Sequence, residues 1–166
     1  MPWQAGVIEP LGWVRVEMDS KQRIVALMLP ALDARSRAVP DDEETLSPRI
    51  ADALRGYVEG SDQVLRSLPI TAAATPFIEL VRQELCAIPF GSVTTYGEVA
   101  KRIGKPGAAR AIGRVCATNK VLLIVPCHRV LAAKGQGGFA LGPVAKDTLL
   151  TMERAALAGM HQSRSR

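Results

Sequence analysis

The chain has 166 residues, a formal net charge of +5 and a hydrophobic content of 48%, which is enough apolar sequence to bury the core of one domain or two small ones. No apolar run approaches the roughly 20 residues of a membrane span, and the N-terminus lacks the basic and apolar segments of a secretory signal. Three well-separated cysteines, Cys86, Cys116 and Cys127, argue against a disulfide scaffold and favour a reducing, cytoplasmic location.

The first half of the chain, residues 1–74, predicts a small α/β domain. Apolar and polar residues alternate over residues 14–18, and an apolar run follows a turn signal, so residues 8–29 predict a hairpin or a short meander. Residues 33–48 are rich in Asp, Glu, Arg and Pro and predict a solvated surface loop.

A helix is predicted after this loop. Ser47 is suited to cap it, Pro48 to occupy its first position, and Gly60 to end it. We expect a linker to follow and place a domain boundary within residues 61–75, so that residues 75–166 form the second domain.

The second half predicts a mainly helical domain. Thr75 and Pro76 favour the start of a helix that ends before Pro89. The basic tail after Gly159 is predicted to fray. The whole chain is therefore expected to be an α+β protein, with a small α/β domain followed by a mainly helical one.

Two helices joined by a tight turn are predicted next. Thr95 and Glu98 have the spacing of a capping box, which favours a helix to about Ile103. Residues 104–107 form a glycine turn, and residues 108–119 predict a second helix. This order is typical of a helix-turn-helix, the winged-helix-like motif that places its second helix in the DNA major groove.

The second of these helices has two different faces. Its apolar face carries Ala108, Ile112, Val115 and Cys116, and its opposite face carries Arg110, Gly113, Arg114 and Ala117. Small residues allow close approach to a groove, and arginines can contact phosphates or base edges. An ordinary core helix with solvated arginines fits this pattern equally well.

The most informative segment surrounds Cys127. Four apolar residues, 122–125, precede Pro126, and the pattern predicts a buried strand that leads directly to the cysteine. His128 and Arg129 follow, and basic neighbours lower the pKa of a thiol and make it nucleophilic. A buried structural cysteine is the alternative, but we expect burial of the polar pair to be costly, which favours a reactive thiol.

Charge is distributed unevenly between the two halves. Residues 1–74 contain 8 Lys/Arg and 11 Asp/Glu, a net charge of −3, whereas residues 75–166 contain 13 and 5, a net charge of +8. A basic half that carries the reactive cysteine suits a polyanionic partner. An ordinary solvated basic surface would have the same composition.

Several segments in one order resemble the O6-alkylguanine-DNA alkyltransferases, a family of suicide DNA-repair proteins. The resemblance extends over the whole second half and is carried by Thr75-Pro76-Phe77, Ile88-Pro89-Phe90-Gly91, Thr95 to Ala100, Ala109 to Gly113, Asn119, Pro126 to Val130, Lys146 and Leu149 to Glu153, with a weaker match at Pro10-Leu11-Gly12. It implies a monomeric, single-turnover methylated-DNA–[protein]-cysteine S-methyltransferase. The expected partner is double-stranded DNA containing O6-alkylguanine, or O4-alkylthymine, with no cofactor and no membrane.

The resemblance also implies roles for the site residues. Cys127 would be the nucleophile and permanent alkyl acceptor, His128 would take its proton through a water, and Glu153 would orient the imidazole. Because a thiol cannot reach a base inside the duplex, the base must be flipped out. Arg110 would then fill the vacated stack, and Tyr96 would rotate a phosphate and donate a proton to guanine N3.

Other matched residues would shape the DNA interface and the pocket. Thr95, Ala111, Gly113 and Arg114 are expected to contact DNA, and Asn119 to brace the helix and the active-site strand that leads into Pro126. The carbonyls of Cys127 and Val130 would accept the exocyclic amine of guanine. Residues 135–139, including Gly138 and Phe139, would form a flexible lid.

Some positions depart from the family pattern. Lys120 stands where proline is common, Phe139 where tyrosine is common, Leu141 where glycine is common and Arg82 where tryptophan is frequent. These differences affect substrate range and rate rather than the reaction. A structural zinc is not expected, because no cysteine precedes Cys86 and the chain has 2 histidines, His128 and His161.

Two other classes of protein remain as alternatives. A lesion sensor related to the alkyltransferases would bind DNA without repairing it, but such proteins have another residue in place of Cys127. A Cys-His hydrolase usually has its cysteine and histidine far apart in sequence.

Overall fold

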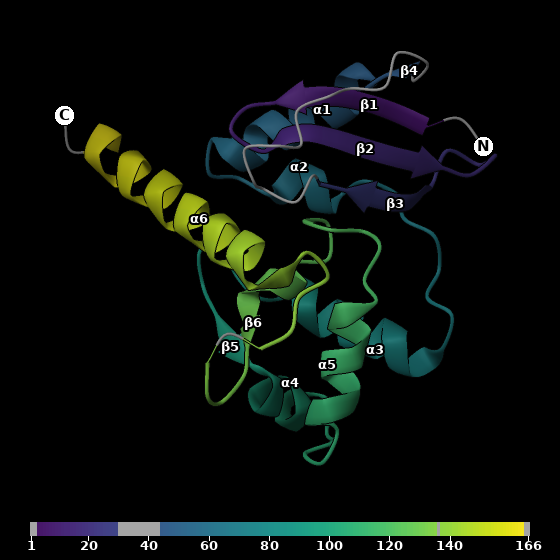
Figure 1. Cartoon of the computed structure of the whole chain (residues 1–166), viewed down its shortest axis with the longest axis vertical. Coiled ribbons are helices and arrows are strands. Elements are labelled where there is room, and N and C mark those ends of the chain that lie inside the picture. Colours follow the sequence, from purple (N-terminus) through teal and green to yellow (C-terminus); the bar gives the residue numbers. More distant parts are fainter. Residues whose placement is uncertain (1–2, 30–43, 136, 165–166) are drawn as a thin grey trace.

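The computed structural model describes residues 3–29, 44–135 and 137–164 and has an α+β architecture. A four-stranded sheet and two helices form one part of the molecule, and three further helices with a two-stranded sheet form the other (Figure 1). The long C-terminal helix, α6 (Gly142–Arg164), lies beside both parts. It continues past Gly159, where the sequence predicts fraying.

The sheet has the strand order β3-β2-β1-β4. Its first three strands form an antiparallel meander and β4 runs parallel to β1, with bounds β1 (Trp3–Ile8), β2 (Gly12–Met18), β3 (Ile24–Met28) and β4 (Glu44–Thr45). Val14, Val16 and Met18 are buried at alternate positions, so the period-two pattern identified this meander correctly. Residues 33–43 of the predicted loop lie outside the described residues, and its last part contains β4, which the sequence did not predict.

Helix α1 (Pro48–Val58) packs on the sheet through a buried face of Ile50, Ala53, Leu54 and Tyr57. The predicted helix is confirmed, and Gly60 follows it with φ of 108°. Ser47 occupies the predicted N-cap position and Pro48 the first helical position, but the Ser47 side chain makes no capping hydrogen bond. A short helix, α2 (Gln63–Arg66), lies in the segment predicted as a linker.

The two halves of the chain meet along β3. The amide of Leu27 donates to the carbonyl of Lys120 at 2.8 Å, and the amide of Leu122 donates to the carbonyl of Leu27 at 3.2 Å. Buried apolar side chains of both halves belong to one cluster. The boundary at residues 61–75 stays a prediction about chain organisation, and the contact at β3 fixes where the segment leading to Cys127 begins.

Three helices of the second half are confirmed: α3 (Pro76–Cys86), α4 (Tyr96–Arg102) and α5 (Ala109–Ala117). Thr75 and Thr95 cap the first two, each accepting a hydrogen bond at 3.2 Å from the amide three residues later. Between them, β5 (Thr94–Thr95) pairs in parallel with β6 (Val130–Leu131). This pairing places the start of α4 beside the residues that follow the cysteine.

Within the described part of the chain, the helices are all too short or too polar to cross a bilayer.

Candidate active site

The segment before Cys127 is buried but is not a strand, and the predicted strand was wrong. Residues 122–125 form turns, in which Leu123 has φ of 65° and the amide of Val125 donates to the carbonyl of Val121 at 3.0 Å. The amide of Leu122 donates to the carbonyl of Leu27 in β3 at 3.2 Å, but the amide of Ile124 donates to the carbonyl of Leu122 at 2.8 Å, so the chain turns here instead of continuing as a strand beside β3. Cys127 then begins a single 3₁₀ turn, Cys127–Arg129.

The thiol of Cys127 is fully buried and is held by Asn119. The Asn119 side-chain nitrogen, Nδ2, lies 3.1 Å from Sγ of Cys127 and donates to the carbonyl of Val125 at 2.9 Å. Burial raises the pKa of the Cys127 thiol to about 11, and the hydrogen bond from Asn119 offsets part of that rise. The predicted lowering of this pKa by His128 and Arg129 was therefore wrong.

His128 and Glu153 form a buried pair. Nε2 of His128 lies 2.7 Å from Oε1 of Glu153, while Oε2 of Glu153 accepts a hydrogen bond from the amide of Gly91 at 2.8 Å. A carboxylate only accepts, so the imidazole proton sits on Nε2 and the lone pair on Nδ1. Nδ1 is buried and has no hydrogen-bond partner among the described residues. Burial lowers the pKa of His128, which keeps the ring neutral and able to take a proton.

Arg129 points away from the thiol, into a cluster of charges. Its Nη2 donates to Asp62 at 2.7 Å and to Glu153 at 2.9 Å, and its Nη1 donates to the carbonyl of Ile88 at 2.9 Å. Burial of the His128–Arg129 pair was expected to be costly, and these bonds offset that cost. Burial favours the protonated form of Glu153, yet hydrogen bonds from His128 and Arg129 outweigh it and hold its pKa near 2.

Tyr96 lies against the predicted lid. Its hydroxyl donates to the carbonyl of Gly138 at 2.8 Å, and burial raises its pKa to about 12, so it stays a donor at neutral pH. Gly137 has φ of 70°, and a Cβ there would lie 2.8 Å from the Tyr96 ring. The ring of Phe139 approaches His128 edge-on at 6.3 Å. Gln136 of the lid lies outside the described residues.

The two carbonyls expected to accept the guanine amine already have one donor each. The carbonyl of Cys127 accepts from the amide of Val130, and the carbonyl of Val130 accepts from Nζ of the buried Lys146 at 2.5 Å. Each oxygen has a second lone pair for a substrate. Lys146 was matched in the sequence, but no role for it was predicted.

Two residues of the first half were missed by the sequence analysis. Tyr57 donates to Oε1 of Glu153 at 2.8 Å, and Asp62 is paired with Arg129 and Arg66. Tyr57 lies on the apolar face of α1, and its spacing from the other apolar residues predicts only a core residue. Asp62 lies in a polar segment with no motif. Only the tertiary contacts identify them.

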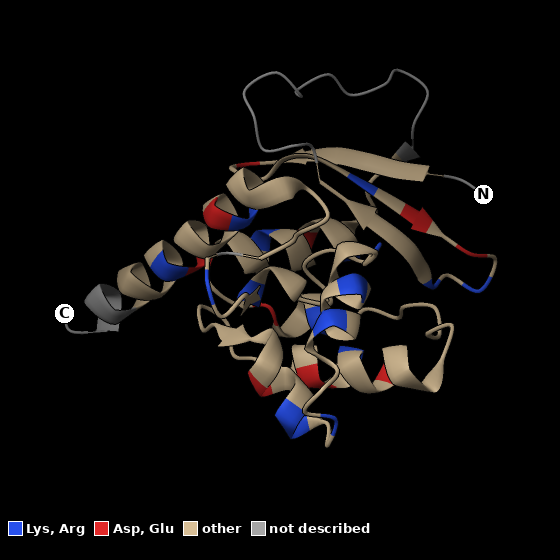
Figure 2. Ribbon diagram, turned by 60° about the horizontal axis from the view of Figure 1, so that its bottom comes forward, with Lys and Arg blue, Asp and Glu red and all other residues tan. Residues whose placement is uncertain are grey.

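Helix α5 turns its basic face outward. Arg110 and Arg114 are exposed, Ala111 and Gly113 are half-buried, and Ile112 and Cys116 anchor the opposite face. The side chains of the two arginines make no hydrogen bond or ion pair within the described ranges. Lys and Arg residues are also spread over the neighbouring helices of this half (Figure 2).

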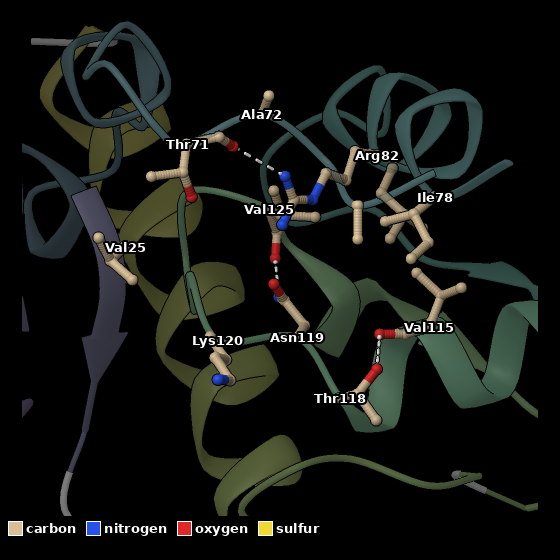
Figure 3. Close-up of a pocket in the computed structure, with 12 residues that line it drawn as sticks. Val25, Thr71, Ala72, Ile78, Arg82, Val115, Thr118, Asn119, Lys120 and Val125 are labelled. Atoms are coloured by element: carbon tan, nitrogen blue, oxygen red, sulfur yellow. Dashed lines mark hydrogen bonds between the residues drawn. The ribbon is translucent and has the colours of Figure 1, made fainter. Parts of the chain in front are cut away.

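A cavity of about 290 Å³ is lined in part by Asn119 (Figure 3). Val25 of β3, Arg82 of α3 and Val125 contribute to its wall, together with Lys120. Arg82 donates to the carbonyl of Thr71 at 3.1 Å. Cys127 and the described lid residues do not line this cavity, which adjoins the candidate alkyl site through Asn119.

Comparisons with known proteins agree with this geometry. Residues 76–155 match the family model described as 6-O-methylguanine DNA methyltransferase, DNA binding domain. A methylated-DNA–protein-cysteine methyltransferase of Shigella flexneri is 40% identical over 89% of this chain and 92% of its own. One from Saccharolobus islandicus is 35% identical over 87% and 90%.

Solved structures give the same result. Mycobacterium tuberculosis OGT in complex with DNA superimposes with a TM-score of 0.73 at 27% identity, covering 94% of both chains. The O6-methylguanine-DNA methyltransferase of Pyrococcus kodakaraensis gives 0.70 at 25% identity, covering 91% of this chain and 98% of its own. Fold and site thus define a DNA-directed methyltransferase. The chain belongs to the methylated-DNA–protein-cysteine methyltransferase family.

Proposed function

We propose that this protein repairs DNA by moving an alkyl group from O6 of guanine, or O4 of thymine, to Sγ of Cys127. Membership of the family supports the reaction. The geometry at Cys127 supports the assignment of the residues. Nδ2 of Asn119 donates a hydrogen bond to Sγ of Cys127 at 3.1 Å, and the imidazole of the next residue, His128, is held by a hydrogen bond to Glu153 at 2.7 Å.

The chemistry is a displacement at carbon. The thiol proton passes through a water to Nδ1 of His128, the sulfur attacks the alkyl carbon, and the bond from that carbon to O6 breaks. Its electron pair remains on the guanine, which regains a proton, with Tyr96 donating toward N3. Glu153 stabilises the imidazolium that forms. A thioether does not hydrolyse, so each molecule acts once.

The DNA-binding step is assigned to α4, the glycine turn and α5, as a helix-turn-helix. The exposed basic face of α5 supports entry of this helix into a groove, where Ala111 and Gly113 allow close approach and Thr95 and Arg114 bind phosphates. Arg110 occupies the space left by the flipped base. Residues 75–166 would thus carry binding and chemistry, and residues 1–74 would support them.

Substrate entry requires movement near Tyr96. Cys127 is fully buried, and the bond between Tyr96 and Gly138 holds the lid against the start of α4. Breaking this bond frees the Tyr96 hydroxyl for guanine N3 and opens a path to the sulfur.

Mass spectrometry after mixing with duplex DNA containing O6-methylguanine tests the proposal. We expect one methyl group per protein, on Cys127. Binding without an adduct would identify a lesion sensor instead, and turnover of an acyl substrate would identify a hydrolase. More than one methyl group per molecule would contradict the suicide reaction.

A further inference from the structure

The hydroxyl of Tyr57 reaches the His128–Glu153 pair from the opposite half of the chain. Tyr57 lies in the last turn of α1, is 1% exposed, and packs its ring edge-on against Phe90 with centroids 5.5 Å apart. Its hydroxyl donates to Oε1 of Glu153 at 2.8 Å and lies 3.4 Å from Nε2 of His128. Simple packing would not require this polar contact.

Oε1 of Glu153 accepts hydrogen bonds from three residues, of which Arg129 contributes two nitrogens, with Nε at 3.2 Å. Nε2 of His128 lies at 2.7 Å, the Tyr57 hydroxyl at 2.8 Å and Nη2 of Arg129 at 2.9 Å. Burial and the neighbouring Glu153 charge raise the pKa of Tyr57 well above its usual value, so the hydroxyl remains a donor throughout the working range of pH. Each additional donor lowers the negative charge that this oxygen can offer to an imidazolium.

Asp62, also in the first half, acts on the same pair from the other side. It is 2% exposed and accepts a hydrogen bond from Nη2 of Arg129 at 2.7 Å, while Arg66 pairs with its second oxygen at 3.1 Å. Its negative charge offsets the positive charge that Arg129 presents to Glu153. The other ionisable groups that act on His128 are Glu153 and Lys146 of α6, with Lys146 opposing protonation.

We propose that Tyr57 is a positioning residue of alkyl transfer: by sharing Oε1 of Glu153 with His128, its hydroxyl limits how strongly the imidazole holds the proton of Cys127. This inference rests on the proposed function. The resting site is then a neutral thiol beside a neutral imidazole, with the proton transferred only when substrate is in place. The first half of the chain thus contributes to the chemistry as well as to the fold.

The proposal predicts opposite effects for two substitutions in the first half. Tyr57→Phe keeps the ring against Phe90 but removes one donor, so Glu153 binds the imidazolium more strongly. Asp62→Asn removes a negative charge and leaves Arg129 less compensated, so protonation of His128 becomes harder. Asp52→Asn is the matched control, because this α1 carboxylate is 71% exposed and pairs with Arg55 on the surface.

The measurement is the single-turnover rate with free O6-benzylguanine as a function of pH, since this substrate needs no base flipping. The acid limb falls where His128 becomes protonated. We expect its midpoint to rise by roughly half to one pH unit in Tyr57→Phe, to fall in Asp62→Asn, and to stay in place in Asp52→Asn. NMR titration of His128, distinguished from His161 by His161→Gln, gives the same midpoints without turnover.

An unchanged or lower midpoint in Tyr57→Phe would overturn the proposal, whatever the change in rate, because a purely structural tyrosine would alter stability or rate alone. Should Asp62→Asn fail to fold, Tyr57→Phe remains decisive. Failure of the proposed function is distinguishable: the wild-type protein would then form no alkyl adduct, while the NMR midpoints could still be compared.

Discussion

Arginine occupies two contrasting environments in this protein. Arg129 is fully buried and bonded to Asp62, Glu153 and the carbonyl of Ile88. Arg110 and Arg114 are exposed on α5, with no ion pair to any residue that the structure describes. The cost of desolvating the Arg129 guanidinium is offset by its hydrogen bonds to these partners, so its charge stabilises buried carboxylates and does not reach the surface. The charges on α5 remain available to an anionic partner.

This contrast suggests that the buried site around Cys127 carries the chemistry and the exposed face of α5 carries DNA binding. Cys127→Ala would separate the two functions. Alkyl transfer should be lost completely, because no other thiol faces the His128–Glu153 pair. Affinity for duplex DNA should be nearly unchanged, since the thiol makes no phosphate contact. Mass spectrometry and a DNA-binding titration measure the two effects. Methyl uptake at Cys86 or Cys116 in this variant would show that the wrong thiol had been chosen.

Arg129→Met tests how much the buried arginine contributes to stability. Removing this guanidinium leaves the carboxylates of Asp62 and Glu153 buried without their main partner, which should lower the free energy of unfolding by about 3–5 kcal/mol. Denaturant unfolding measures the change. Arg55→Met is the control: its partner Asp52 is 71% exposed and the loss should be at most about 1 kcal/mol. Equal losses in the two variants would remove the distinction between buried and surface arginines.

Local signals in the sequence were sufficient for much of the second half. The capping residues Thr75 and Thr95 predicted the starts of α3 and α4, and the apolar spacing predicted the buried face of α5. These features depend on residues within a few positions of each other. The strand predicted before Pro126 was wrong because a short buried run has the same composition whether it pairs with a neighbour or folds into turns.

The environment of Cys127 could not be predicted in the same way. Adjacent side chains diverge, so Arg129 leaves the thiol and binds Asp62, 67 positions earlier in the chain. The role of Tyr57 depends on a contact 96 positions away. The sequence predicts a reactive thiol at Cys127 beside the His128 imidazole, but the pKa of the thiol depends on burial, which only the assembled fold determines.

Arg110→Ala is the first test of the exposed arginines on α5. If Arg110 replaces the flipped base in the stack, losing it should slow repair of duplex DNA on the order of tenfold to a few hundredfold, from an unstacking cost of a few kcal/mol. Reaction with free O6-benzylguanine should change little, because no base is flipped. Single-turnover rates on the two substrates provide the test. Equal slowing on both would place Arg110 in the pocket or in the fold.

The smallest expected effect belongs to Arg114→Ala, on the same exposed face. A single phosphate contact releases about one counterion, so the slope of log affinity against log salt should become shallower by about one. The free-base reaction should be unchanged, and weaker binding should affect damaged and undamaged duplexes alike, because a phosphate contact carries no sequence information. Arg55→Ala, an exposed arginine of the first half, should leave the slope unaltered. If Arg114→Ala did the same, α5 would not present its basic face to the backbone, and exposure alone would not distinguish binding arginines from solvated ones.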